Sequence, residues 1–176
     1  MKKGILQNGT RVVSYAPDNE CDNELGTITG SYEYNGKVYY DIRLDGQDGN
    51  DLDMNEEGIH FDVVPTEFVN LTPHDIKLNN GTVYPASGKV ARVENDFSNF
   101  CCGISKVFYG DVENLPEPKR GTMYIVSAMV LAAESSKHRL CRRRDLVAPA
   151  TGHPDCIRKD GFIVSVPGFV RNQDAP

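Results

Sequence analysis

Ser127 and the arginines that follow it are the residues whose types and spacing could bind an anion. Thr122 to Val126 is predicted to form a short buried strand, and Ser127 occupies the N-cap position of a helix of strong helix formers. A capped helix start directs free backbone N–H groups outward, and these can hold a phosphate or carboxylate. Arg142–Arg144 follow the helix as possible partners. The same pattern also fits a core strand and helix followed by a solvated basic segment.

Arginine is unevenly distributed, and its clustering after the acidic first third indicates the chemistry of a ligand. The arginines concerned are Arg92, Arg120, Arg139, Arg142, Arg143, Arg144, Arg158 and Arg171. Guanidinium groups bind phosphates through paired hydrogen bonds and stack on purines, so a nucleotide-type anion is the expected ligand. We expect Arg144, with Arg92 or Arg158, to contact the phosphates while the N–H groups after Ser127 complete the site. Asp145 would orient a neighbouring guanidinium.

The remaining candidates around this site are neighbouring arginines and aromatic residues. Arg142 and Arg143 are expected to be solvated. Phe108, Tyr109 or Tyr124 could stack on a base, because aromatic faces attract both bases and cations.

The sequence lacks the short motifs that mark an enzyme. It contains no G-x-S-x-G, H-E-x-x-H or C-x-x-C segment, so we expect a binding protein with no catalytic residues and no cofactor. His138-x-x-Cys141 and His153-x-x-Cys156 repeat one spacing, but zinc sites usually begin with a pair of cysteines. We therefore expect no metal.

Composition and charge limit the class of protein. Apolar residues make up 39% and charged residues 25% of the 176-residue chain, which is typical of a globular protein, and no apolar run has the length of a membrane helix. The five cysteines and the polar segment after Met1 favour the cytoplasm. Residues 1–66 hold five Lys and Arg against thirteen Asp and Glu, a distribution that argues against sequence-specific binding of nucleic acid.

The elements that would position these residues fall into two predicted domains. Residues 1–66 contain short apolar runs separated by turns, with hairpin signals at Asn8-Gly9 and Asn35-Gly36, and resemble a small SH3-like or Tudor-like barrel. Pro65 to Glu67 marks the boundary. Residues 67–176 are predicted to form an α+β domain, an antiparallel sheet with one principal helix.

Within the second predicted domain, three segments have an expected conformation. Glu94 to Gly103 is polar and is expected to be irregular, whereas Ile104 to Val112 alternates as a strand does. Lys159-Asp160-Gly161 predicts a hairpin turn.

Residues 68–172 resemble a group of small proteins encoded by phages and prophages. The segments that carry the resemblance are Asn70-Leu-Thr-Pro-His74, Pro85-Ala-Ser-Gly-Lys-Val-Ala-Arg92, Tyr109-Gly-Asp-Val-Glu-Asn-Leu-Pro-Glu-Pro118, Gly121-Thr-Met-Tyr-Ile-Val-Ser127, Arg144-Asp-Leu-Val-Ala-Pro149 and Ile157-Arg158. His74 joins the ligand-binding candidates. The group is similar to anti-defence sponges, which bind the cyclic ADP-ribose or cyclic oligonucleotide signals of Thoeris, CBASS and related immune systems.

The resemblance implies a homo-oligomeric, non-enzymatic inhibitor in the host cytoplasm that sequesters a nucleotide immune signal without cleaving it. The acidic N-terminal domain leaves an alternative open. In that alternative the protein is a phage accessory factor or protein-binding inhibitor, and its acidic barrel docks on a basic surface of a host defence protein.

Overall fold

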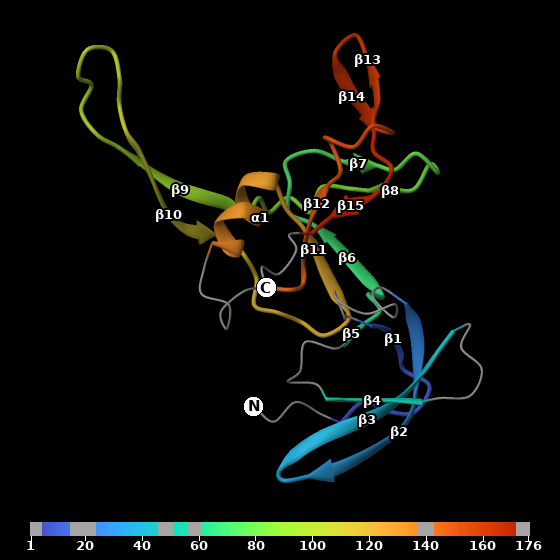
Figure 1. Cartoon of the computed structure of the whole chain (residues 1–176). Coiled ribbons are helices and arrows are strands. Elements are labelled where there is room, and N and C mark those ends of the chain that lie inside the picture. The colour runs from blue at the N-terminus through green and yellow to red at the C-terminus, as the bar shows by residue number, and fades with distance from the viewer. Residues whose placement is uncertain (1–4, 15–23, 46–50, 56–60, 137–142, 172–176) are drawn as a thin grey trace. The chain divides into compact units, whose positions relative to one another are not determined.

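The chain divides into two compact units, residues 1–64 and 65–176, and the division lies two residues before the expected boundary. The computed structural model describes residues 5–14, 24–45, 51–55, 61–136 and 143–171 (Figure 1). The described residues are rich in strands and contain one helix, as expected for a β-rich chain.

The N-terminal unit is a five-stranded antiparallel sheet with the strand order β4-β3-β2-β1-β5. Its strands are β1 (Arg11–Ser14), β2 (Leu25–Tyr34), β3 (Lys37–Leu44), β4 (Asp51–Asn55) and β5 (Phe61–Val63). The turn between β2 and β3 is the predicted Asn35-Gly36 hairpin, and both residues have the positive φ that this two-residue turn requires, 51° and 74°. Over the described residues the sheet is not closed into a barrel.

One face of this sheet forms the core of the N-terminal unit. Tyr40, Ile42 and Leu44 alternate along β3, so their side chains share a face with the buried Val12 and Ile28. The Tyr40 hydroxyl accepts a hydrogen bond from the Leu6 amide at 3.1 Å, which satisfies a polar group in an otherwise apolar cluster.

The C-terminal unit contains the helix and ten strands among its described residues. They are β6 (Glu67–Asn70), β7 (Ile76–Lys77), β8 (Val83–Tyr84), β9 (Arg92–Phe97), β10 (Val107–Glu113), β11 (Thr122–Ile125), α1 (Ala128–Ser135), β12 (Leu146–Pro149), β13 (Ile157–Lys159), β14 (Phe162–Ser165) and β15 (Phe169–Val170).

The central sheet of this unit is mixed, and here the expectation of an antiparallel sheet was wrong. Its order is β15-β12-β11-β6; β11 is parallel to both β6 and β12, and only β15 runs antiparallel. The helix explains the difference, because a helix between two neighbouring strands returns the chain to the same end of the sheet and makes the strands parallel. The three two-stranded ribbons of the unit are antiparallel.

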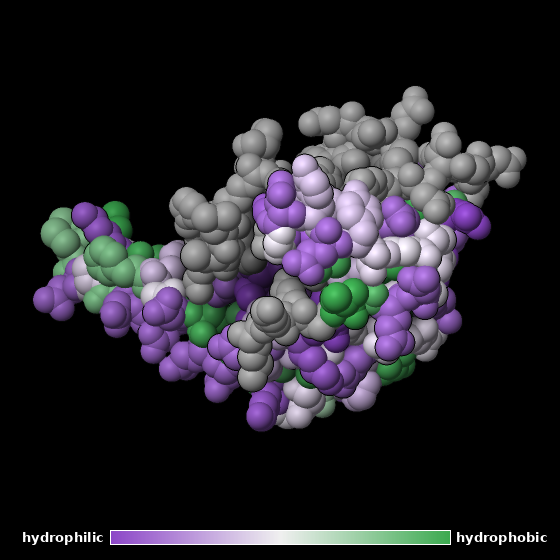
Figure 2. Space-filling model, turned by 90° about the horizontal axis from the view of Figure 1, so that it is seen from below, coloured by the Kyte–Doolittle hydropathy of each residue, from purple (hydrophilic) through white to green (hydrophobic). Residues whose placement is uncertain are grey.

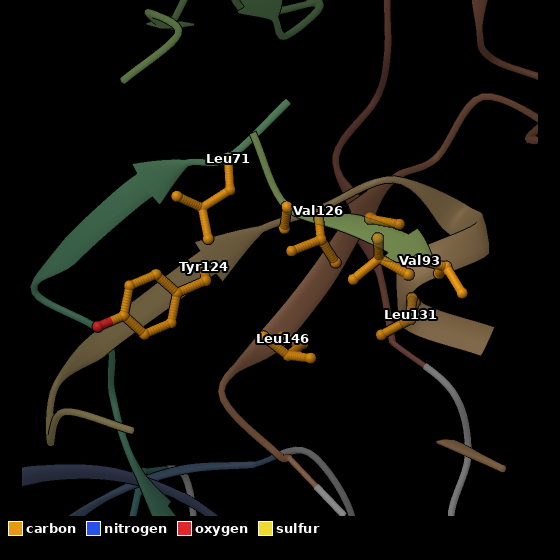
Figure 3. Close-up of a cluster of buried hydrophobic side chains, with 9 residues drawn as sticks. Leu71, Val93, Tyr124, Val126, Leu131 and Leu146 are labelled. Carbon is orange, nitrogen blue, oxygen red and sulfur yellow. The ribbon is translucent and has the colours of Figure 1, made fainter. Parts of the chain in front are cut away.

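Both faces of the central sheet are buried. On one face, Leu71, Tyr124, Val126 and Leu146 pack with α1 and with Val93 of β9 (Figure 3). On the other face, the core residues are Met123, Ile125 and Val147, and Phe68, Tyr84 and Phe169 pack against them as stacked and edge-on rings. A sheet covered on both sides holds its strand ends rigidly, which suits the support of a binding site.

The longest ribbon of the unit, which we call the arm, comprises residues 92–113, and it corrects another expectation. Residues 94–97 belong to β9, and the ribbon is closed at its tip by Cys102 and Gly103, with φ of 52° and 79°. The expectation of an irregular segment is therefore wrong for residues 94–97, whereas residues 98–100 belong to neither strand, as expected. The predicted turn at Asp160-Gly161 is confirmed, with φ of 52° and 81° between β13 and β14.

Candidate anion-binding site

The parallel strands β6, β11 and β12 end at one edge of the central sheet, which we call the carboxyl edge. Asn70 is in register with Ile125, and Ile125 with Val147, so β6 and β11 end at the same level and β12 continues two residues further, to Pro149. Neighbouring strands lie about 4.8 Å apart, and the three exits therefore fall within about 12 Å of one another. In open α/β sheets, ligands bind at this edge.

Helix α1 begins at the carboxyl edge, directly after β11. Ser127 has an extended backbone, with φ −69° and ψ 155°, and its hydroxyl accepts a hydrogen bond from the Val130 amide at 3.3 Å. The amides of Ala128 and Met129 have no carbonyl one turn earlier in the helix, and both residues are exposed. The first turn contains no acidic side chain. The positive end of α1 is therefore available to an external anion.

Three basic residues lie on segments that are hydrogen-bonded to the chain just beyond the ends of β6 and β12. The Arg158 guanidinium donates a hydrogen bond to the Thr151 carbonyl at 2.8 Å, just beyond the end of β12. Arg92 is exposed and follows Ala91, whose amide donates to the Leu71 carbonyl at 3.0 Å at the end of β6. Lys89, exposed in the loop before Ala91, was not among the sequence candidates.

The position of Lys89 is fixed by the loop in which it lies. The Ser87 amide donates to the Asn70 carbonyl at 2.9 Å, and the Ser87 hydroxyl donates to the carbonyl of Lys89 at 3.2 Å. The Ala91 bond to Leu71 closes the loop on its other side. Lys89 thus lies between two residues, Ser87 and Ala91, that are hydrogen-bonded to the end of β6. The sequence signal for this lysine is its place in the Pro85–Arg92 segment, but that signal is informative only when the segment is known to lie beside β6.

Asn70 organises the carboxyl edge from inside, with 2% of its surface exposed. Its amide nitrogen donates to the carbonyls of His74 and Tyr84, at 2.8 and 2.9 Å. Its amide oxygen accepts from the amide and hydroxyl of Thr72, at 2.9 and 2.7 Å. The Asn70-Leu-Thr-Pro-His74 segment is therefore a turn that is held by the buried side chain of Asn70. His74, at the end of this turn, is exposed.

Arg144 and Asp145 lie at the opposite edge of the sheet, so the structure does not bring them to Ser127. Leu146 is in register with Tyr124, which places Arg144 about five residues, or roughly 16 Å, from Ser127 along the strand direction. That separation exceeds the length of an arginine side chain. The expected cradle of Arg144 and the helix amides is therefore not formed, whereas Arg92, Arg158, His74 and Ser127 are at or near the carboxyl edge.

Arg143, expected to be solvated, is the arginine that the fold encloses, and Arg144 is exposed. Its guanidinium donates two hydrogen bonds to the Asp145 carboxylate, both 2.7 Å long, and a third to the Pro116 carbonyl at 2.7 Å. The side chains of Arg143 and Asp145 are 13% and 15% exposed. Asp145 orients a neighbouring guanidinium, as expected, but this guanidinium belongs to Arg143 and not to the proposed phosphate ligand Arg144.

The surroundings of Arg143 stabilise its positive charge. Burial alone would lower the pKa of Arg143, but the hydrogen bonds and attraction of Asp145, together with the buried Glu134 of α1, raise it. The guanidinium also lies over the ring of Tyr124, 5.8 Å from the ring centre. Tyr124 is 5% exposed and donates its hydroxyl hydrogen bond to the Glu117 carbonyl at 3.3 Å, so its ring belongs to the core and stacks on Arg143 instead of a ligand.

The two remaining expectations concern Phe108 and metals. Phe108 lies in the outer part of the arm, paired with Asp96 four residues beyond Arg92, and so is not part of the carboxyl edge. His138 and Cys141 fall outside the described residues. Within the described segments, no group of three or more His, Cys, Asp and Glu side chains is placed to hold a metal ion.

No family model, curated protein or solved structure matches this chain. The resemblance to phage proteins therefore stays a prediction. In the parts of the chain that the structure describes, no helix combines the length and apolar character of a membrane span.

Proposed function

We propose that the C-terminal unit binds an anionic, nucleotide-type small molecule at the carboxyl edge. The observation that supports this most strongly is the position of α1, whose open first turn lies at the end of a parallel strand, while Arg158 is bonded to the Thr151 carbonyl just beyond the neighbouring strand β12. Backbone amides, a helix dipole and guanidinium groups are the donors that phosphate groups prefer in proteins.

The donors have separate tasks in this proposal. The amides of Ala128 and Met129 hold one phosphate, and Arg158 neutralises its charge from the side of β12. Arg92 and Lys89 approach from the side of β6 and contact a second phosphate or the sugar. Each hydrogen bond to a charged group contributes about 1.5–3 kcal/mol, so two or three of them dominate the affinity after the cost of association.

The biological role that we propose is sequestration of a nucleotide immune signal, of the cyclic ADP-ribose or cyclic oligonucleotide type, by a phage-encoded protein in the host cytoplasm. This part rests on the resemblance of residues 68–172 to phage proteins. A protein that only has to hold its ligand needs a rigid set of donors, and the covered central sheet offers a rigid support for them. No chemical step follows binding.

For the N-terminal unit we propose an SH3-like barrel. The strand order β4-β3-β2-β1-β5 supports this fold, because pairing of the first strand with the last is what such a barrel requires. The long β2 strand has a register shift between Ile28 and Gly30, where a bulge would let the strand bend between two halves of a barrel.

The experiment that tests the binding proposal is a thermal-shift screen followed by calorimetry. The panel contains ADP-ribose, cyclic ADP-ribose variants and cyclic dinucleotides, with sodium sulfate as an ionic-strength control. We expect Arg158→Ala to weaken binding of the active compound roughly tenfold to two-hundredfold, as loss of a charged hydrogen bond of 1.5–3 kcal/mol implies.

Arg144→Ala is the matched control, because it removes an exposed arginine from the opposite edge of the same sheet. It should leave the Kd unchanged. Equal losses in the two variants would contradict the proposed location, and no binding across the panel would contradict the ligand class. Chromatography of the ligand after heat release should recover it intact; an altered ligand would show that the protein is an enzyme.

A further inference from the structure

The arm carries four large aromatic side chains that are mostly exposed to solvent. Phe97, Phe100, Phe108 and Tyr109 are 68%, 78%, 56% and 61% exposed. The arm projects at the left of Figure 2, where hydrophobic and hydrophilic surfaces lie side by side. With about 150–250 Å² for each aromatic ring, these four side chains expose roughly 400–650 Å² in total, divided between the two faces of the arm and its tip.

The two faces of the arm differ in chemistry. Cross-strand partners share a face, so the pair Phe97–Val107 and the pair Asn95–Tyr109 lie on one face. The other face combines an acidic residue with an aromatic one, because Asp96 is paired with Phe108. By alternation along β9, Arg92 and Glu94 lie on this second face with Asp96, and Arg92 is paired with Glu113, so the charges of this face are mixed with an excess of acidic groups.

The acidic face has an excess of negative charge. The Glu113 side chain shares a hydrogen bond with Glu94 and repels it, and this contact, with burial and with the charges of Asp111 and Asp96, raises the pKa of Glu94. A cationic partner at this face would relieve the repulsion. Packing the same faces of two arms against each other would instead bring two such clusters together.

The ribbon of residues 157–165, which we call the basic hairpin, has the complementary pattern. Lys159 is paired with Phe162, so a cation and an aromatic side chain share one face, and Phe162 is 78% exposed. Arg158 is paired with Ile163 on the other face and donates to Thr151. The face with Lys159 is therefore separate from the candidate anion-binding site.

We propose that the arm of one copy docks on the basic hairpin of a second copy, with Phe108 packed against Phe162 and Asp96 paired with Lys159. In Figure 1 the arm and the basic hairpin project from different sides of the C-terminal unit, so both are accessible to other copies. Because the two surfaces differ, the contact is head-to-tail and generates a closed ring or an open chain of copies.

The apolar area on the docking face indicates a weak contact that depends on protein concentration. Stable interfaces bury about 800 Å² on each partner, whereas Phe108, 56% exposed, supplies roughly 80–140 Å². Opposite charges across the contact add specificity and make it sensitive to salt.

The first test is light scattering of the full-length protein during gel filtration, under reducing conditions because Cys101 and Cys102 are exposed at the tip of the arm. We expect a mass above the 19.5 kDa of one chain at tens of micromolar protein, decreasing as NaCl is raised from 0.1 to 1 M. Phe108→Ser should give a monomer. Tyr109→Ser, a similarly exposed aromatic on the opposite face, is the matched control and should leave the mass unchanged.

Charge reversal identifies the partner surface. Asp96→Lys and Lys159→Asp should each give a monomer, and the double variant should regain the wild-type mass because the pair is restored with its signs exchanged. A monomeric wild-type protein would overturn the proposal. An assembly that is indifferent to Lys159→Asp, or that is lost in Tyr109→Ser and kept in Phe108→Ser, would also overturn it. All these variants retain Arg158, so their ligand binding reports separately on the proposed function.

Discussion

Replacement of Arg143 by methionine tests how the start of β12 is held in place. Methionine keeps an apolar side chain over the Tyr124 ring but removes three hydrogen bonds, two to Asp145 and one to the Pro116 carbonyl. The Asp145 carboxylate, 15% exposed, then loses its cation. Breaking a buried ion pair by removing one partner costs about 3–5 kcal/mol, and residual solvent access reduces this, so we expect a loss of about 2–4 kcal/mol.

The neighbouring Arg144 supplies the control for this measurement. Arg144→Ala changes the same residue type one position further on, at an exposed site where contacts contribute little, and should alter the free energy of unfolding by less than about 1 kcal/mol. Urea unfolding followed through the NMR resonances of α1 and β12 measures the C-terminal unit separately from the N-terminal unit.

A double-mutant cycle with Asp145→Asn separates the pair from the other contacts of Arg143. The two single losses should exceed the double loss by about 1–3 kcal/mol, because either substitution alone already breaks the same pair. Additive losses, or an Arg143→Met variant as stable as Arg144→Ala, would refute the view that this ion pair supports the fold.

Three further predictions concern the carboxyl edge and the arm. Asn70→Ala should cost about 2–4 kcal/mol in urea unfolding, because it removes four hydrogen bonds: two that the amide nitrogen donates to the carbonyls of His74 and Tyr84, and two that the amide oxygen accepts from the buried Thr72. Ser127→Asp should retain the stability of the unit, since aspartate also caps helices, yet weaken ADP-ribose binding in calorimetry by at least tenfold, because the carboxylate occupies the anion position. The pKa of Glu94 is raised above its ordinary value of 4.5, so its folded form binds the proton more tightly and stability falls as the pH rises through that interval. Thermal unfolding should therefore show Glu94→Gln more stable than wild type at pH 7 and equal to it below pH 4.

Local features of the fold could be predicted from the sequence because local residues determine them. The Asn35-Gly36 and Asp160-Gly161 turns need positive φ at both positions, and Asn, Asp and Gly adopt it readily. Ser127 was recognised as a helix cap for a similar reason, since its hydroxyl bonds within the first turn. The turn at Cys102-Gly103 was missed because cysteine seldom marks such a turn.

Pairing between distant segments was not predictable in the same way. The parallel register of β6 with β11 depends on packing across more than fifty residues, and the short strands contain no pattern that distinguishes parallel from antiparallel neighbours. Arg143 was a different case. It lies two residues before Asp145, and the chain bends at residues 144 and 145 before β12 begins, so the sequence alone did not distinguish Arg143 from Arg144 as the partner of this carboxylate.

The measurement that tests the central claim most directly is an NMR titration of the ¹⁵N-labelled protein with inorganic phosphate at constant ionic strength. If the start of α1 binds anions, the amide resonances of Ala128 and Met129 should shift in a saturable way, and those next to Arg144 should remain unchanged. Shifts confined to the segment around Arg144, or unchanged Ala128 and Met129 resonances at tens of millimolar phosphate, would contradict an anion site at the carboxyl edge.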